Sequence, residues 1–273
     1  MTEQPEEKIE LRLSAGEFAF VLGVRHDEQY GLDLVKLQLG LLTDEEARLV
    51  MNVSSHSLMA RRLLSVGGDG SPALAPELER AVRLFIESDW MIQCNRAEGD
   101  EDPTFLSFHF GAGGLLQQSV EDEVTHAFEI LPRARLAAEA AARFYEVPRA
   151  APREVVSYSL PEEVLSEVRQ SQDGEHIRAR LGRSGVPGEV ASALAADFLR
   201  TRFLGSVVRV EHDEGGTSLA QHRFFLLKGA ERLWLLRPRV SEAERAVEFF
   251  PATRESLAEA FRRVVEEPRQ LRA

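Results

Sequence analysis

The chain has 273 residues, 44% of them hydrophobic, which is enough apolar surface for one large domain or two modest ones. Its 45 acidic and 33 basic residues give a formal net charge of -12, which disfavours binding to nucleic acid or to an acidic membrane surface. Cys94 is the single cysteine, so an internal disulfide is excluded. With an acidic N-terminus and no apolar run long enough to span a bilayer, these features predict a cytoplasmic protein.

In chain order, residues 1–10 read as a flexible N-terminus, and the first helix begins after Ser14. Glu17 lies three residues beyond Ser14, which is the spacing of a capping box. A variable loop is expected next, followed by a long helix from Thr43 to about Leu64. Thr43 and Glu46 form a second capping box, and the apolar positions that follow step at helical spacing.

The stretch Gly67–Pro72 predicts a mobile loop, and the stretch Pro76–Ser88 predicts a helix. The hydrophobic period then changes to two, which indicates strands. The expected elements are strands at Trp90–Arg96, Thr104–Phe110, Leu115–Ser119 and Val124–Leu131, with a glycine-rich turn at 111–114, and then a helix at Leu136–Tyr145.

The second half repeats this order. Ser159 and Glu162 have the spacing of another capping box, and a helix is expected from about Pro187 to Phe203. Strands follow at about Ser206–Glu211, Ala220–Leu227, Arg232–Arg237 and Ala246–Phe250, and then a helix at Leu257–Val265. The sequence therefore predicts an α+β fold of two related halves, residues 11–147 and 153–267. Each half has antiparallel strands and amphipathic helices, and the two are arranged about a pseudo-twofold axis.

The motifs do not indicate catalysis or cofactor binding. Gly111–Gly114 lies between two strands, so it favours a hairpin over a phosphate-binding loop. The seven histidines have no close ligand spacing, and His109, His126 and His222 are expected on half-exposed strand faces. Cys94 is expected to be a buried structural thiol. We therefore assign no catalytic, metal-binding or cofactor-binding residues.

The two longest hairpin tips are the candidate partner-binding sites. In the first half the acidic loop contributes Glu98, Asp100 and Asp102, with the nearby rings of Phe108 and Phe110 on one strand face. In the second half the corresponding loop consists of Asp213, Glu214, Gly215 and Gly216.

Three features of the sequence resemble the EspG family. They are the plan of two halves, the stretch Ser57–Leu64 followed by a Gly/Asp loop and Pro76-Glu77-Leu78, and Trp234 before the last strand. Members of that family are cytoplasmic chaperones of type VII secretion that hold PE-PPE pairs. They bind through a sheet face, a loop between strands and a C-terminal helical region. The resemblance implies a non-enzymatic chaperone or adaptor for a helical secretion substrate, without a cofactor.

Two alternatives stay open at the level of sequence: an enzyme, or a small-ligand regulatory module, with its site between the two halves. Either one predicts a concave site that gathers ionisable groups with shifted pKa values. A protein-binding scaffold instead predicts exposed apolar side chains. Self-association also remains open.

Overall fold

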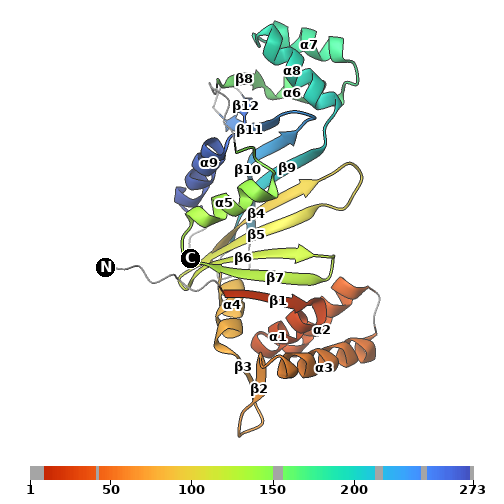
Figure 1. Ribbon diagram of the computed structural model, residues 1–273, viewed down its shortest axis with the longest axis vertical. Coiled ribbons are helices and arrows are strands. Elements are labelled where there is room, and N and C mark those ends of the chain that lie inside the picture. The colour runs from red at the N-terminus through yellow and green to blue at the C-terminus, as the bar shows by residue number, and fades with distance from the viewer. Residues whose placement is uncertain (1–8, 41–42, 150–155, 213–217, 241–244, 271–273) are drawn as a thin grey trace, which may run out of the picture. The chain divides into compact units, whose positions relative to one another are not determined.

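The computed structural model describes residues 9–40, 43–149, 156–212, 218–240 and 245–270, and it confirms a mixed α+β fold (Figure 1). The chain divides into two compact units. Unit 1 comprises residues 1–91 and 106–134, and unit 2 comprises residues 92–105 and 135–273.

The sheet strands of unit 1 lie in the order β1-β7-β6-β5, and each neighbouring pair is antiparallel. Their bounds are β1 Ile9–Ser14, β5 Thr104–Gly111, β6 Gly114–Glu121 and β7 Thr125–Leu131. As expected, Gly111 pairs with Gly114 across a two-residue turn. Gly114 has a φ of 130°, a backbone conformation that glycine adopts without strain.

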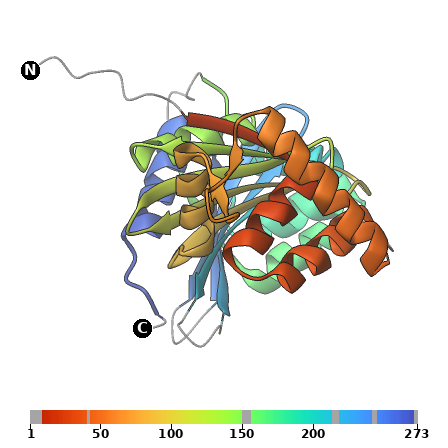
Figure 2. The ribbon, with the colours of Figure 1, turned by 90° about the horizontal axis from the view of Figure 1, so that it is seen from below.

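Helices cover one face of this sheet. They are α1 Ala15–Arg25, α2 Glu28–Leu39, α3 Asp44–Ala60 and α4 Pro76–Ile86, and the small hairpin strands β2 Leu64–Val66 and β3 Pro72–Leu74 precede α4. Both predicted capping boxes, Ser14 with Glu17 and Thr43 with Glu46, are confirmed. Phe18 of α1 packs on Phe128 of β7 in the centre of the core. Figure 2 shows α1, α2 and α3, in red and orange, gathered beside one another.

The predicted loop after α1 and the predicted end of the long helix were wrong. The expected variable loop after α1 contains helix α2, because Asp27 caps its first turn and Leu32 and Val35 bury its inner face. Residues 67–71 form a loop, as predicted, and this loop connects the paired strands β2 and β3, so only Pro72 of the predicted stretch lies in a strand. The long helix α3 also ends at Ala60, and Leu64 opens β2.

The strands of unit 2 lie in the order β4-β9-β10-β11-β12-β8. Their bounds are β4 Trp90–Ala97, β8 Tyr158–Pro161, β9 Phe203–His212, β10 Ser218–Lys228, β11 Leu233–Val240 and β12 Arg245–Pro251. The pairs from β9 to β8 are antiparallel, with an irregularity between His222 and Phe224. The predicted strands therefore all occur, most of them longer than expected.

Helices cover both faces of the strands of unit 2. They are α5 Arg135–Phe144, α6 Glu162–Gln170, α7 Gly174–Arg183, α8 Gly188–Leu199 and α9 Arg254–Glu266 (Figure 1). Phe224 meets Phe261 of α9 on one face. Leu227 and its cross-strand partner Trp234 pack with α6, α7 and α8 on the other, as the alternation of side chains along a strand requires.

The predicted capping box of Ser159 and Glu162 was wrong. Strand β8 runs through Ser159, and Pro161 is the residue before the first turn of α6, without a side-chain cap. Helix α7, capped by Asp173, fills the expected variable loop of the second half. Helix α8 ends at Leu199, because Phe203 already belongs to β9.

The order of elements repeats along the chain. A strand and three helices, β1-α1-α2-α3, precede β4 to β7 and α5, and β8-α6-α7-α8 precede β9 to β12 and α9. The segment β2-β3-α4 interrupts the first series alone. The compact units differ from the sequence halves, because most of β4 and all of α5 belong to unit 2. The boundaries 11–147 and 153–267 and the pseudo-twofold axis remain predictions, and residues 150–155 of the junction lie outside the described residues.

Candidate functional site

The first predicted partner loop connects β4 and β5 in unit 2. Glu98 at its start is half-buried and forms an ion pair with Arg96, which also binds Glu146 at 2.8 Å. Asp100 and Asp102 at the tip are exposed. Glu98 therefore anchors the loop, while the two aspartates present their carboxylates to solvent. The second predicted loop, Asp213, Glu214, Gly215 and Gly216, lies outside the described residues.

The two predicted aromatic contacts are less available than expected. Phe108 is fully buried, so its ring belongs to the core and cannot contact a partner. Phe110 is half-buried and stacks on Trp90 with ring centroids 3.9 Å apart. Alternation places Phe108 and Phe110 on one face correctly, but it does not reveal what covers that face.

Other apolar side chains in unit 2 are exposed. Leu204 of β9 is 41% exposed, Phe225 of β10 is 36% exposed, and Phe105 at the start of β5 is 37% exposed. Leu204 and Phe225 share one sheet face, because Phe225 pairs with Ser206, two residues beyond Leu204. His222 stacks on the Phe225 ring at 5.3 Å. In the sequence Phe225 is recognisable only as one of two adjacent phenylalanines, and its exposure was not predicted.

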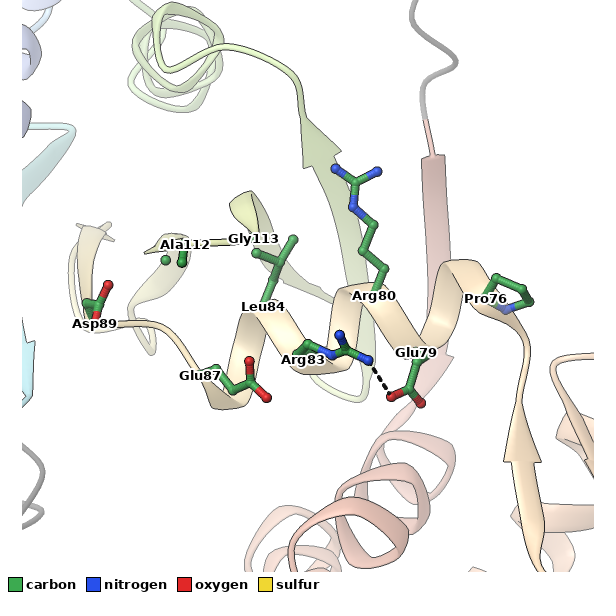
Figure 3. Close-up of a pocket in the computed structure, with 10 residues that line it drawn as sticks. Pro76, Glu79, Arg80, Arg83, Leu84, Glu87, Asp89, Ala112 and Gly113 are labelled. Carbon is green, nitrogen blue, oxygen red and sulfur yellow. Dashed lines mark hydrogen bonds and ion pairs between the residues drawn. The ribbon is translucent and has the colours of Figure 1, made fainter.

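A groove of about 450 Å³ lies in unit 1, along α4 and the turn between β5 and β6. Figure 3 shows Arg80, Arg83, Glu79 and Glu87 on its helical side and Leu84 directed toward Gly113. Glu79 pairs with Arg83 and with Arg25 of α1. Because these charges are mostly exposed, water screens them, and the groove has the chemistry of a wet ionic surface rather than of a desolvated reaction site.

Two histidines form a buried polar chain in unit 1, although both were predicted on half-exposed faces. Nε2 of His109 is 3.2 Å from Oε1 of Gln118, and Nε2 of Gln118 is 3.2 Å from Nδ1 of His126. Nε2 of His126 lies 3.0 Å from Nε2 of Gln38, and the tautomer of each imidazole decides which group of the chain donates. Burial lowers the pKa of His126 to about 4.

Several other buried ionisable groups are engaged in internal contacts. Burial raises the pKa of Cys94 to about 12, as expected for a structural thiol. Asp197 accepts a hydrogen bond from the Trp234 indole at 2.9 Å, and Glu248 binds Arg237 and Arg239. Among the residues that the structure describes, His, Cys, Asp and Glu nowhere gather in a group of three suited to a metal ion. None of the described helices combines the length and apolar character of a membrane span.

This arrangement has the fold of a known class of protein, the EspG chaperones. The structure of the type VII secretion system chaperone EspG5 from Mycobacterium tuberculosis, solved in complex with a PE25-PPE41 dimer, matches with a TM-score of 0.68. The match covers 96% of this chain and 98% of that chain, at 11% sequence identity, so the likeness concerns the fold.

The chain belongs to the family described as "Uncharacterised protein YfjC", whose model matches residues 26–260. None of the curated proteins matches the sequence.

Proposed function

We propose that this protein is a non-enzymatic chaperone or adaptor that binds a helical polypeptide. The observation that carries the proposal is the likeness of fold to a secretion chaperone over nearly the whole of both chains. A likeness confined to one sheet or one helix pair would be common among α+β proteins and would carry no function. Here it covers 96% of this chain and 98% of the other.

The surface of unit 2 supports a binding role. Leu204 and Phe225 project from the same sheet face, and both remain partly exposed to water. An amphipathic helix could bury its apolar stripe against these side chains, which is a common mode of polypeptide recognition. Buried carboxylates such as Glu17 and Glu248 accept several internal hydrogen bonds each, so the fold uses them for its own stability.

The loop from Glu98 to Asp102 is the second proposed contact. Its exposed carboxylates would orient a partner that carries basic residues, since complementary charges steer association and fix register. We extend the same proposal to the loop from Asp213 to Gly216. We include Phe110, which is half-buried beside Trp90, in the proposed contact.

The test is native mass spectrometry of the tagged full chain purified gently from its own cells. We expect a stoichiometric complex with a single polypeptide, and circular dichroism of that polypeptide should show helix. A variant carrying Leu204→Asp and Phe225→Asp should lose the complex. The matched control carries Leu49→Asp and Val53→Asp, which are exposed on α3 in unit 1, and should keep it. A chain that purifies alone, or equal capture by both variants, would contradict the proposal.

A further inference from the structure

A short segment after α9 lies across the sheet of unit 2. We define residues 267–270 as the strap, and the side chains beneath it as the cradle: Arg209 and Glu211 from β9, with Gln221 and Arg223 from β10. Arg209 and Gln221 are cross-strand neighbours in the β9-β10 ladder. All four strap residues are exposed, whereas Arg209 and Glu211 are almost completely buried. The strap therefore lies on the surface, over a buried pair of opposite charges.

The cradle binds the main chain of the strap through groups of both polarities. Nη1 of Arg209 donates to the carbonyl oxygens of Val264 and Glu267 at 2.7 and 2.8 Å. Nε of Arg209 lies 2.9 Å from Oε1 of Glu211, and Oε2 of Glu211 accepts the amide N–H of Gln270 at 2.6 Å. Arg209 and Glu211 therefore bind a backbone carbonyl and a backbone N–H of an extended chain, and every peptide has both groups.

One charge in the cradle is poorly satisfied by the strap. The Arg223 side chain is only 16% exposed, and its Nη1 and Nη2 lie 3.4 and 3.1 Å from the carboxylate of Glu267. Its Nε and Nη2 are buried without a well-aligned hydrogen bond to any described residue. A guanidinium matches a carboxylate best through two parallel bonds, which the strap does not supply.

We propose that the cradle of Arg209, Glu211 and Arg223 is a binding site for an extended acidic peptide segment, which the strap occupies in the absence of that ligand. A carboxylate of the ligand would form two parallel hydrogen bonds with the guanidinium of Arg223. Its main chain would replace the Glu267 carbonyl on Arg209 and the Gln270 N–H on Glu211. With two arginines and one glutamate, the uncovered cradle carries a net charge of +1 and attracts an acidic segment.

The test of this site does not depend on the proposed chaperone function, because the probe is a peptide with the sequence of the strap. A fluorescent peptide with the sequence of residues 266–270, blocked at both ends, is titrated into two full-length proteins by anisotropy. One is the natural chain, and the other carries Glu267→Gln and Gln270→Ala to loosen the strap. We expect binding at least about tenfold tighter to the loosened variant, because a tethered strap competes at high effective concentration.

The matched probe has glutamine in place of the glutamate that corresponds to Glu267. It should bind the loosened variant about tenfold more weakly, since Arg223 loses its charge-assisted hydrogen bonds. Adding Arg223→Gln to that variant should abolish the difference between the two probes. Equal binding to both proteins, or no preference for the acidic probe, would overturn the proposal.

A second measurement uses the natural chain alone and covers the case in which the loosened variant does not fold. Saturating acidic probe should accelerate hydrogen exchange at the Gln270 amide, because displacement of the strap breaks its bond to Glu211. Exchange at Gln270 that the probe leaves unchanged would show that the strap is a fixed part of the fold.

Discussion

Glu17 illustrates how a single buried carboxylate organises its surroundings. Its Oε2 accepts the Ser14 amide at 2.9 Å as part of the capping box, while Ser57 of α3 and Arg61 at the C-terminal end of α3 donate at 2.8 to 2.9 Å. Burial tends to raise the pKa of Glu17, but these bonds outweigh burial and hold the pKa below its usual value. Arg61 also donates to the carbonyl of Arg12 at 2.7 Å. This contact occupies an acceptor on the edge strand β1 that another chain could otherwise pair with.

His126 should make the stability of the protein depend on pH. Its folded pKa of about 4 lies below the ordinary value of 6.5, so the unfolded chain binds more protons between these values. The stability is fully present above pH 6.5 and falls as the pH is lowered toward 4. The expected loss from this residue is roughly 3 kcal/mol, measured by urea unfolding at a series of pH values.

The control for this prediction is a pair of variants. His126→Gln should flatten the decrease of stability with falling pH, whereas His222→Gln, at an exposed position on β10, should leave it unchanged. The same decrease in both variants would assign it to other groups.

Gly229, in the turn between β10 and β11, should not tolerate a side chain. A Cβ at this position would overlap the side chain of Asp197, which receives the Trp234 indole N–H in the core. Gly229→Ala should therefore destabilise the protein by about 1–3 kcal/mol in thermal or chemical unfolding, as overpacking does. Gly182→Ala, in α7 with open space around it, should instead be neutral or stabilising by up to about 1 kcal/mol. Similar effects of the two substitutions would contradict the packing argument.

At the scale of single elements, Ser14 and Ser159 show that the same sequence spacing can have different structural outcomes. Both serines precede a glutamate by three residues, but only Ser14 accepts a bond from the amide of that glutamate. Ser14→Ala should cost about 1 kcal/mol of unfolding free energy, which is typical for the loss of an N-cap. Ser159→Ala, on the exposed side of β8, should change it by less than about 0.5 kcal/mol. An equal cost would mean that the serines act through something other than capping.

The sequence predicted strands well because their alternation persists over whole elements, as in β10. It missed α2 and α7 because their apolar positions are few. Helix α2 buries little more than Gly31, Leu32 and Val35, and α7 buries Ile177 and Leu181. Such helices form because neighbouring helices cover their inner faces, and local spacing does not show this. The Ser159 error has a related cause: pairing with β12 extends β8 through residues that also fit a helix start.

At the scale of the whole molecule, the sequence resemblance to the EspG family is confirmed for the fold. The candidate site was harder to predict than the fold. Alternation correctly grouped Phe108 with Phe110, yet other elements bury Phe108. Alternation also does not show which sheet face is covered, so it could not predict that Phe225 is exposed. The strap on Arg209 depends on contacts between residues more than 50 positions apart, which spacing in one sequence cannot reveal.

The acidic loop provides a test of partner binding at this scale. Asp100→Asn, Glu101→Gln and Asp102→Asn together remove three exposed charges and leave the Glu98 anchor on Arg96 intact. If the partner presents basic residues, its affinity for the full chain should fall about tenfold at low salt and less at high salt, because salt screens exposed charges. The matched control, Asp122→Asn with Glu123→Gln in the turn after β6, removes charge elsewhere and should bind normally. Calorimetric titration of the purified partner decides between them, and a loop variant that binds as tightly as the control would exclude this loop from the interface.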